Sequence, residues 1–495
     1  MNLSKSLYTI AIQCPKALWL KKYKPEVLTP TDEFSQSKFN IGHAVGELAC
    51  DLLPNGIKVD FNPNLEQMVR KTKELIDSGY TTICEAAFYF ENILVIVDIL
   101  EIDEDGVTIY EVKSSTSLKD IYLHDVSIQY YTLKNLGYKI KSANVIYLNN
   151  NYVRDDELDL KELFVIEDVT KKVELLQEEI PSNLETFEKY LSNKQSEPNI
   201  DIGKHCKNPY DCTALDYCWK CQRNIPDYSI FNIFNLGSKK QIELYTQGIT
   251  NIDDIPDNFE MTANQKEEVN NYKSKQTYID KTFINEFLKT LSYPIYYLDF
   301  ETYQQAIPLF KGISAYEQIP FQYSLHIEYE DGKLEHKEFL AKDGIDSRYE
   351  LAKSLVENIP SNVTVLAYNM SFEKTILRKL SNLYGEFTYD LMSIHDNMQD
   401  LMTPFQKKWY VTPFMKGSYS IKYVLPALVP EFEKAYKDLE LVHNGSEAMN
   451  AYANMSNLSN EEKIAYRKAL LEYCKLDTLA MVRILEVLRK TVLFN

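Results

Sequence analysis

Two apolar strand-like runs that end in carboxylates, far apart in the chain, constrain the fold more than any other feature. The first is Ile93 to Val97, followed by Asp98, and the second is Ile295 to Leu298, followed by Asp299. Runs rich in Ile, Val and Leu predict buried strands, and helical patterns flank both of them. The chain has 495 residues, which at roughly 100–200 residues per domain predicts about two to four domains. The sequence therefore predicts an α/β fold with more than one core.

The predicted domain boundaries follow from these patterns. The first α/β domain covers residues 1–225 and ends after a cysteine-rich stretch, where Pro226 and its neighbours predict a break. A helical linker covers 226–290, and a second α/β domain covers 291–495. The glycine-centred turns of the linker resemble one half of a helix-hairpin-helix, and a plain helical spacer is the alternative.

Charge and hydropathy exclude several classes of protein. The net charge of -18 argues against a protein that coats nucleic acid through bulk electrostatics. It does not exclude a nuclease, because metal-dependent nucleases collect carboxylates. No apolar run approaches the roughly 18 residues that span a bilayer. We therefore expect a soluble, cytoplasmic protein without a membrane partner.

The N-terminal half contains a candidate metal site. Asp98 ends one strand, and Glu111 and Lys113 lie on the next, where side chains two residues apart share a face. Gln129 lies downstream on a predicted helix, and His43 lies upstream on another. A phosphodiesterase needs carboxylates aimed at one point together with a cation, and this set supplies both.

Cysteines form a second candidate site. Of the eight cysteines, four lie between Cys206 and Cys221, and Cys14 lies near the start. This uneven distribution is not a disulfide framework and predicts one metal or cluster site in a reducing compartment. One possibility is Zn²⁺ held by Cys206, Cys212, Cys218 and Cys221.

The C-terminal half contains a second carboxylate set. Asp299 and Glu301 share one face of a strand and can hold a pair of divalent ions. Glu373 begins a predicted helix that follows another strand. Tyr473 and Asp477 share one face of a second predicted helix. A tyrosine beside such acids can orient the attacking water.

The order His43, Asp98, Glu111-x-Lys113, Gln129 resembles the RecB-like branch of the PD-(D/E)XK nucleases, whose fold is restriction-endonuclease-like. This resemblance implies metal ligation by Asp98 and Glu111, with help from His43, Lys113 and Gln129. The segment from Ser4 to Trp19 is similar to the start of nucleases with a [4Fe-4S] cluster. By that likeness the ligands are Cys14, Cys206, Cys212 and Cys218, with Cys221 as the alternate.

The C-terminal set resembles the DEDD exonucleases of the ribonuclease H-like fold, in the subgroup that has a tyrosine in the third motif. This resemblance implies Mg²⁺ or Mn²⁺ bound by Asp299, Glu301, Glu373 and Asp477, with Tyr473 orienting water. Glu373 stands where the family usually has Asp. The two domains together resemble an uncharacterised bacterial family of RecB-like nucleases fused to such an exonuclease.

We therefore expect a metal-dependent nuclease, acting on single-stranded DNA ends from two hydrolytic sites, in bacterial DNA repair or defence. A helicase or another repair or defence protein is an expected partner. Two alternatives stay open. One is a nucleic-acid-binding or assembly protein with one vestigial site, and the other is an RNA-processing 3'-5' exonuclease.

Overall fold

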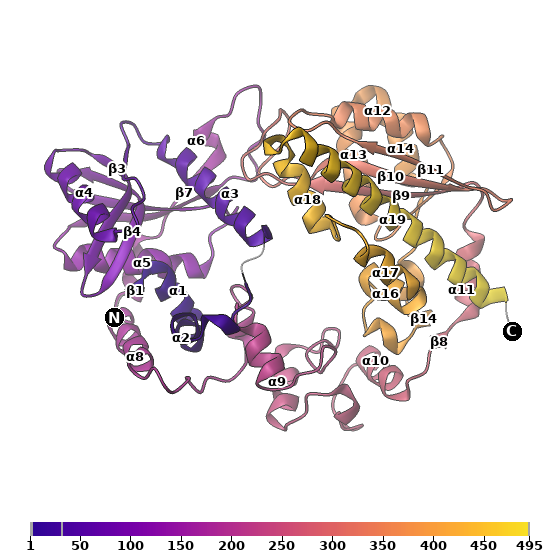
Figure 1. The fold of residues 1–495 in the computed structure, drawn as a ribbon, viewed down its shortest axis with the longest axis horizontal. Helices are drawn as coiled ribbons and strands as arrows, with labels where there is room; N and C mark the ends of the chain where they lie inside the picture. Colours follow the sequence, from indigo (N-terminus) through magenta and orange to yellow (C-terminus); the bar gives the residue numbers. More distant parts are fainter. Residues whose placement is uncertain (1–2, 31–32, 494–495) are drawn as a thin grey trace. The chain divides into compact units, whose positions relative to one another are not determined.

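The computed structural model describes residues 3–30 and 33–493, and the chain has a mixed α/β fold (Figure 1). It divides into two compact units. Unit 1 consists of Met1–Ile225 together with the segment Gln305–Tyr316, and unit 2 of Pro226–Gln304 together with Glu317–Asn495. The break between Ile225 and Pro226 falls at the predicted boundary, and the predicted linker 226–290 belongs to unit 2.

Unit 1 is built on a seven-stranded sheet in which β2, β3, β4, β5, β6 and β7 follow one another and β1 pairs with β4. Its strands are β1 (Leu3–Ser4), β2 (Ile57–Lys58), β3 (Thr82–Phe90), β4 (Ile93–Asp103), β5 (Gly106–Lys113), β6 (Ile140–Leu148) and β7 (Phe164–Asp168). Its helices are α1 (Lys5–Gln13), α2 (Pro15–Tyr23), α3 (Glu33–Cys50), α4 (Leu65–Asp77), α5 (Asp120–Asn135), α6 (Leu160–Leu163), α7 (Thr170–Leu176) and α8 (Ile180–Ser192).

Alternation along the strands of unit 1 gives each sheet face its own core. Ala143 and Val145 of β6 pack in the core that includes residues of α1, α4 and α5. Ile146 and Leu148 of the same strand pack with residues of α3. Because side chains alternate along a strand, Glu111 and Lys113 of β5 fall on the face that α1 and α5 cover.

Unit 2 is built on a five-stranded sheet in the order β11, β10, β9, β12, β13. Its strands are β8 (Tyr278–Ile279), β9 (Ile295–Tyr303), β10 (Ile319–Glu328), β11 (Leu334–Leu340), β12 (Thr364–Ala367), β13 (Met398–Asp400) and β14 (Tyr410–Val411). Its helices are α9 (Ser238–Thr246), α10 (Ala263–Ser274), α11 (Lys281–Lys289), α12 (Arg348–Asn358), α13 (Ser371–Leu383), α14 (Thr388–Asp396), α15 (Thr403–Gln406), α16 (Ile421–Leu428), α17 (Glu431–Lys437), α18 (Gly445–Asn454) and α19 (Asn460–Leu493).

The central strand β9 separates two cores in unit 2. Its residues Ile295 and Tyr297 pack with residues of α19, whereas Tyr296 and Leu298 pack with residues of α12, α13 and α14. Strand β9 is antiparallel to β10 and parallel to β12. Asp299 and Glu301 continue the face of Ile295 and Tyr297, so they lie on the side of the sheet that α19 covers.

Within the described part of the chain, no helix combines the length and the hydropathy that crossing a bilayer requires.

A buried leucine of unit 1 tests this account of the core. Replacing Leu100, which is fully buried on β4, by alanine is expected to lower the free energy of unfolding by roughly 2–5 kcal/mol, because it leaves a cavity. Urea unfolding followed by circular dichroism measures the change. The matched control is Leu175→Ala on α7, where the leucine is 78% exposed, and its effect should stay below about 0.5 kcal/mol. Equal losses from the two variants would contradict the assignment of the core.

Candidate active sites

Four acidic side chains of unit 2 come together beside the centre of the sheet. Asp299 and Glu301 lie on β9, Glu373 in the first turn of α13, and Asp477 on α19. The charges of the other three act directly on Asp299. Single ligand atoms of Asp299, Glu301 and Cys474 lie within 4.8 Å of one another. The structure thus places Asp299 and Glu301 within ligand distance of each other, with Glu373 and Asp477 near enough for their charges to act on Asp299.

Burial and mutual repulsion raise the pKa values of these carboxylic acids. Burial, followed by the charge of Asp477, raises the pKa of Asp299 and that of Glu301 well above their ordinary values. Burial raises the pKa of Glu373 to about 8 and that of Asp477 to about 6. The Oε2 atom of Glu373 is buried and has no hydrogen-bond partner. Such an unpaired oxygen among like charges calls for a cation.

The chain itself supplies little positive charge here. The charge of Lys422 lowers the pKa of Asp477, and in the described part of the chain no lysine or arginine is among the main influences on Asp299, Glu301 or Glu373. Carboxylate oxygens are the ligands that Mg²⁺ and Mn²⁺ prefer. The donor set therefore fits divalent ions, with Asp299, Glu301, Glu373 and Asp477 as the residues that would hold them.

Two tyrosines lie at Asp477. The hydroxyl of Tyr436 on α17 donates a hydrogen bond of 2.6 Å to its Oδ1 atom, and the hydroxyl of Tyr473 also lowers the pKa of this carboxylate. The two rings meet edge to face, with centroids 6.2 Å apart. Burial raises the pKa of both tyrosines far above the ordinary value. Both hydroxyls therefore remain protonated and act as hydrogen-bond donors.

Three aspartates near Glu373 in sequence have structural roles instead. Asp400 accepts hydrogen bonds from the backbone N–H groups of Asn369, Met370 and Met402. Asp390 accepts a bond from Ser361, and Asp396 pairs with His395. Glu373 is therefore the acid from this stretch whose charge acts on Asp299, and the charge of the neighbouring Asp400 helps to raise the pKa of Glu373.

In unit 1 the site forms where the pairing between β4 and β5 ends. The Oδ2 atom of Asp98 accepts a 2.7 Å bond from the backbone N–H of Val112 on β5. Burial, followed by the charge of Glu111, raises the pKa of Asp98 to about 7. Opposite this position on β3, Glu85 has a φ of 59°. A non-glycine residue in this left-handed region of backbone space is strained, and such strain often occurs at functional sites.

Two predicted residues, Lys113 and Gln129, donate to the buried carboxylate of Glu111. Lys113 donates to its Oε1 atom at 2.6 Å, and Gln129 of α5 donates to its Oε2 atom at 2.7 Å. Lys113 also contacts the Oδ2 atom of Asp125 at 2.5 Å. Burial acts to raise the pKa of Glu111, but the ammonium groups of Lys113 and Lys5 outweigh it, so that pKa is lowered. Glu111 is therefore ionised, with its oxygens directed at cations.

His43 is not brought into this group. It is exposed on α3, and among the described contacts it hydrogen bonds neither Asp98 nor Glu111. Its charge does reach Glu85 and Glu47. Glu47, one turn further along the helix, pairs with Lys58 at 2.7 Å.

Four predicted cysteines line one small cavity in unit 1: Cys14, Cys206, Cys212 and Cys218. Cys221 is exposed and lies outside this lining. Among the described residues, no three cysteine sulfurs lie within 4.8 Å of one another. Tetrahedral Zn²⁺, with bonds of about 2.3 Å, needs closer sulfurs. An iron–sulfur cluster allows a wider spacing because each thiolate binds a different iron. The described cysteine sulfurs are therefore spaced more widely than tetrahedral Zn²⁺ requires.

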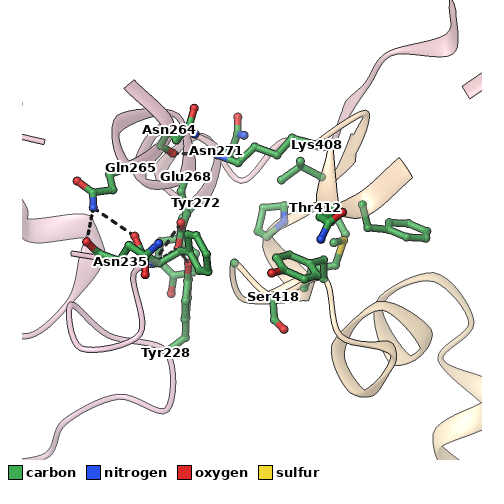
Figure 2. Close-up of a pocket in the computed structure, with 18 of the residues that line it drawn as sticks. Tyr228, Asn235, Asn264, Gln265, Glu268, Asn271, Tyr272, Lys408, Thr412 and Ser418 are labelled. Carbon is green, nitrogen blue, oxygen red and sulfur yellow. Dashed lines mark hydrogen bonds between the residues drawn. The ribbon is translucent and has the colours of Figure 1, made fainter. Parts of the chain in front are cut away.

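A separate pocket of about 390 Å³ lies within unit 2, between α10 and the segment around Thr412 (Figure 2). Glu268 is the one carboxylate in its lining, where it accepts a 2.8 Å bond from the Tyr228 hydroxyl. Gly417, with a φ of 70°, lies against these two side chains, and an added Cβ would come within 2.3 Å of the Tyr228 hydroxyl. The acids of the β9 group do not line this pocket.

Several site residues were not predicted from the sequence. Lys5 and Asp125 join the unit 1 group, and Tyr436 joins the unit 2 group. Asp125 precedes Gln129 by one helical turn, a spacing that could have indicated it. Lys5 and Tyr436 reach their sites through tertiary packing alone, for which no local pattern gives a signal.

The raised pKa values predict how the stability of the metal-free protein depends on pH. Protonation of Glu373 and Asp477 favours the folded state, because their pKa values of about 8 and about 6 in the folded protein exceed the ordinary values of 4.5 and 3.8. This stabilisation is complete below about pH 4 and is lost as the pH rises through 6 and then 8. In EDTA, the melting temperature of unit 2 should fall by an amount on the order of 5 °C between pH 5 and pH 8.

Scanning calorimetry measures this dependence. Excess Mn²⁺ should restore more of the melting temperature at pH 8 than at pH 5, and Glu373→Gln should flatten the curve in EDTA. A melting temperature that stays constant from pH 5 to pH 8 in EDTA contradicts the repulsive acid group.

The comparisons with known proteins give a family without a described activity. The family described as "Domain of unknown function (DUF2779)" matches residues 296–420, a range that includes Asp299, Glu301 and Glu373. No solved structure matches the chain.

Two curated relatives are themselves described as uncharacterized. The chain is 30% identical over 240 residues to protein UU173 of Ureaplasma parvum serovar 3, which covers 46% of this chain and 34% of the relative. It is 28% identical over 222 residues to protein MG366 of Mycoplasma genitalium, which covers 40% of this chain and 33% of the relative. The matched part thus spans about a third of either relative. These matches support an uncharacterised bacterial family.

Proposed function

We propose that this chain is a metal-dependent nuclease that hydrolyses DNA phosphodiester bonds at two sites, as an exonuclease on single-stranded ends, in bacterial DNA repair or defence. The observation that carries the proposal is the acid group of unit 2. Four carboxylates, including a buried and unpaired oxygen of Glu373, converge with no lysine or arginine bound to them among the described residues. Such a group is favourable only with protons or divalent cations bound.

In unit 2 the residues act by holding and orienting. Divalent ions, when bound, supply activation of water and stabilisation of the charge that develops on phosphate. Tyr436 fixes the carboxylate of Asp477 through its hydrogen bond. Tyr473 keeps its proton, so it orients the attacking water through a hydrogen bond and does not remove a proton from it. This division of roles agrees with the resemblance to DEDD exonucleases, and on that resemblance we propose the ribonuclease H-like fold for residues 291–495.

In unit 1, Asp98 and Glu111 are the proposed metal ligands of a RecB-like, restriction-endonuclease-like domain. Gln129 fixes Glu111 by donating to its Oε2 atom. Lys113 lies beside Glu111 and Asp125, and it is the group that would position the water or contact the scissile phosphate. His43 would have to move from its exposed place on α3 to assist, because it bonds neither ligand in the described structure.

The cysteine cavity is proposed to hold a [4Fe-4S] cluster bound by Cys14, Cys206, Cys212 and Cys218. These residues come from the two ends of the 1–225 region. A cluster there would link the start of α2 to the cysteine-rich segment before Ile225. That role is structural. The cluster requires no contact with the carboxylates of unit 1.

Activity on labelled ends tests the two-site proposal. Single-stranded DNA with Mn²⁺ is incubated with anaerobically purified wild type, Lys113→Ala, Asp299→Ala and the double variant. We expect each single variant to remove one component of the cleavage. The double variant should lose activity by about 10²–10⁴-fold, because a charged catalytic group is lost from each site.

The matched controls are Lys141→Ala and Asp331→Ala, which alter a surface pair with Asp103 and a turn of the β10–β11 hairpin. Both controls should cleave like the wild type. A double variant as active as the wild type contradicts the assigned sites. A wild type that cuts neither DNA nor RNA contradicts the function itself, and preferred cleavage of RNA favours an RNA-processing exonuclease.

Metal analysis tests the cysteine site separately. We expect anaerobically purified protein to contain iron and sulfide, with Cys212→Ser losing both and Cys221→Ser retaining both, since Cys221 lies outside the cavity. Iron and sulfide assays together with visible absorption measure this. One zinc per chain that disappears in Cys221→Ser would establish the zinc alternative instead.

A further inference from the structure

We propose that Lys5 is an active-site residue of unit 1, whose ammonium group occupies the cation position between Asp98 and Glu111 and must leave it before a divalent ion binds. This inference rests on the proposed metal site in unit 1. The inference assigns to Lys5 the role of competing with the divalent ion for Asp98 and Glu111.

The contacts of Lys5 are those of a bound cation. Its Nζ atom lies 2.8 Å from Oε2 and 3.0 Å from Oε1 of Glu111, and 3.3 Å from Oδ1 of Asp98. The ammonium group thus bridges the two carboxylates that the sequence assigns as metal ligands. Both Lys5 and Glu111 are well shielded from water, with side chains 18% and 1% exposed. Shielding strengthens the Coulomb attraction between the two groups and makes it costly to leave Glu111 without a cation.

The helix that carries Lys5 does not account for a lysine at this position. Strand β1 pairs with β4 through Leu3 and Ile93, which fixes the start of the chain beside the strand that carries Asp98. The Ser4 side chain caps α1, and Lys5 is the first residue of that helix. A positive charge in the first turn is unfavourable with the helix dipole. The carboxylates of the site, and not the helix, therefore account for a lysine at this position.

Shared contacts and like charge indicate that Lys5 and a divalent ion exclude each other. Asp98, Glu111 and Asp125 are bound to the two lysines Lys5 and Lys113. Each lysine contacts two of the acids, and the contacts of Lys113, at 2.6 and 2.5 Å, are shorter than those of Lys5, at 2.8 and 3.3 Å, so Lys113 is the more firmly held cation. An ion held by the same oxygens of Asp98 and Glu111 would meet the ammonium group of Lys5 at contact distance, so Lys5 must withdraw when the ion binds. The flexible four-carbon stem of lysine allows such a withdrawal.

Binding of Mn²⁺ alone tests this, in a background in which Asp299→Asn and Glu301→Gln remove the unit 2 site. We expect Lys5→Met to bind Mn²⁺ at least about tenfold more tightly than the background protein, measured by electron paramagnetic resonance of free Mn²⁺. Lys141→Met, which removes an exposed lysine elsewhere in unit 1, is the matched control and should leave the affinity unchanged. Equal or weaker binding by Lys5→Met overturns the inference while leaving the metal site in place.

A second readout needs no variant at Lys5. Acetylation of the background protein, followed by mass spectrometry, should label Lys5 several-fold faster with Mn²⁺ than with EDTA, because the ammonium group is released. An unchanged labelling rate with Mn²⁺ bound overturns the inference. If neither the background protein nor Lys5→Met binds Mn²⁺, the unit 1 metal site of the proposed function fails, and the inference fails with it.

Discussion

Repulsion between buried carboxylates is the interaction on which this account depends. A strand places alternate side chains on one face, so Asp299 and Glu301 of β9 are held close together whatever their charge. Packing of α19 against the same face adds Asp477, and the first turn of α13 adds Glu373. Each added acid raises the cost of ionising the others. The fold therefore maintains an arrangement that is favourable only with protons or metal ions present.

In unit 1, lysine side chains offset the repulsion between the carboxylates. Lys113 and Lys5 pair with Glu111 without a metal ion, and the pKa of Glu111 is accordingly lowered, whereas burial raises the pKa values of Asp98 and Asp125. In unit 2 the corresponding pKa values are raised. The two sites thus differ in how they respond to a divalent ion: in unit 2 the ion meets unpaired negative charge, and in unit 1 it competes with a lysine.

Local sequence patterns predicted the parts of these sites that depend on local geometry. Glu111 and Lys113 are two apart on a strand, and Tyr473 and Asp477 are one turn apart on a helix, so each pair is set by its own element. Strand β9 and the α/β class followed in the same way from an apolar run. The contributions of Lys5 from β1–α1 and of Tyr436 from α17 depend on how distant segments pack. The periodicity of the sequence does not encode that packing. His43 is the opposite case: its residue type and its spacing suit a metal ligand, but the fold leaves it outside the unit 1 group.

The central claim is that both carboxylate groups are divalent-ion sites. The most direct measurement is anomalous diffraction at the manganese absorption edge, from crystals of the whole chain grown with Mn²⁺. The account predicts density peaks among Asp299, Glu301, Glu373 and Asp477, and one between Asp98 and Glu111 with the Lys5 side chain withdrawn. Crystals that show no manganese at either group, in protein that is otherwise folded as described, would contradict it.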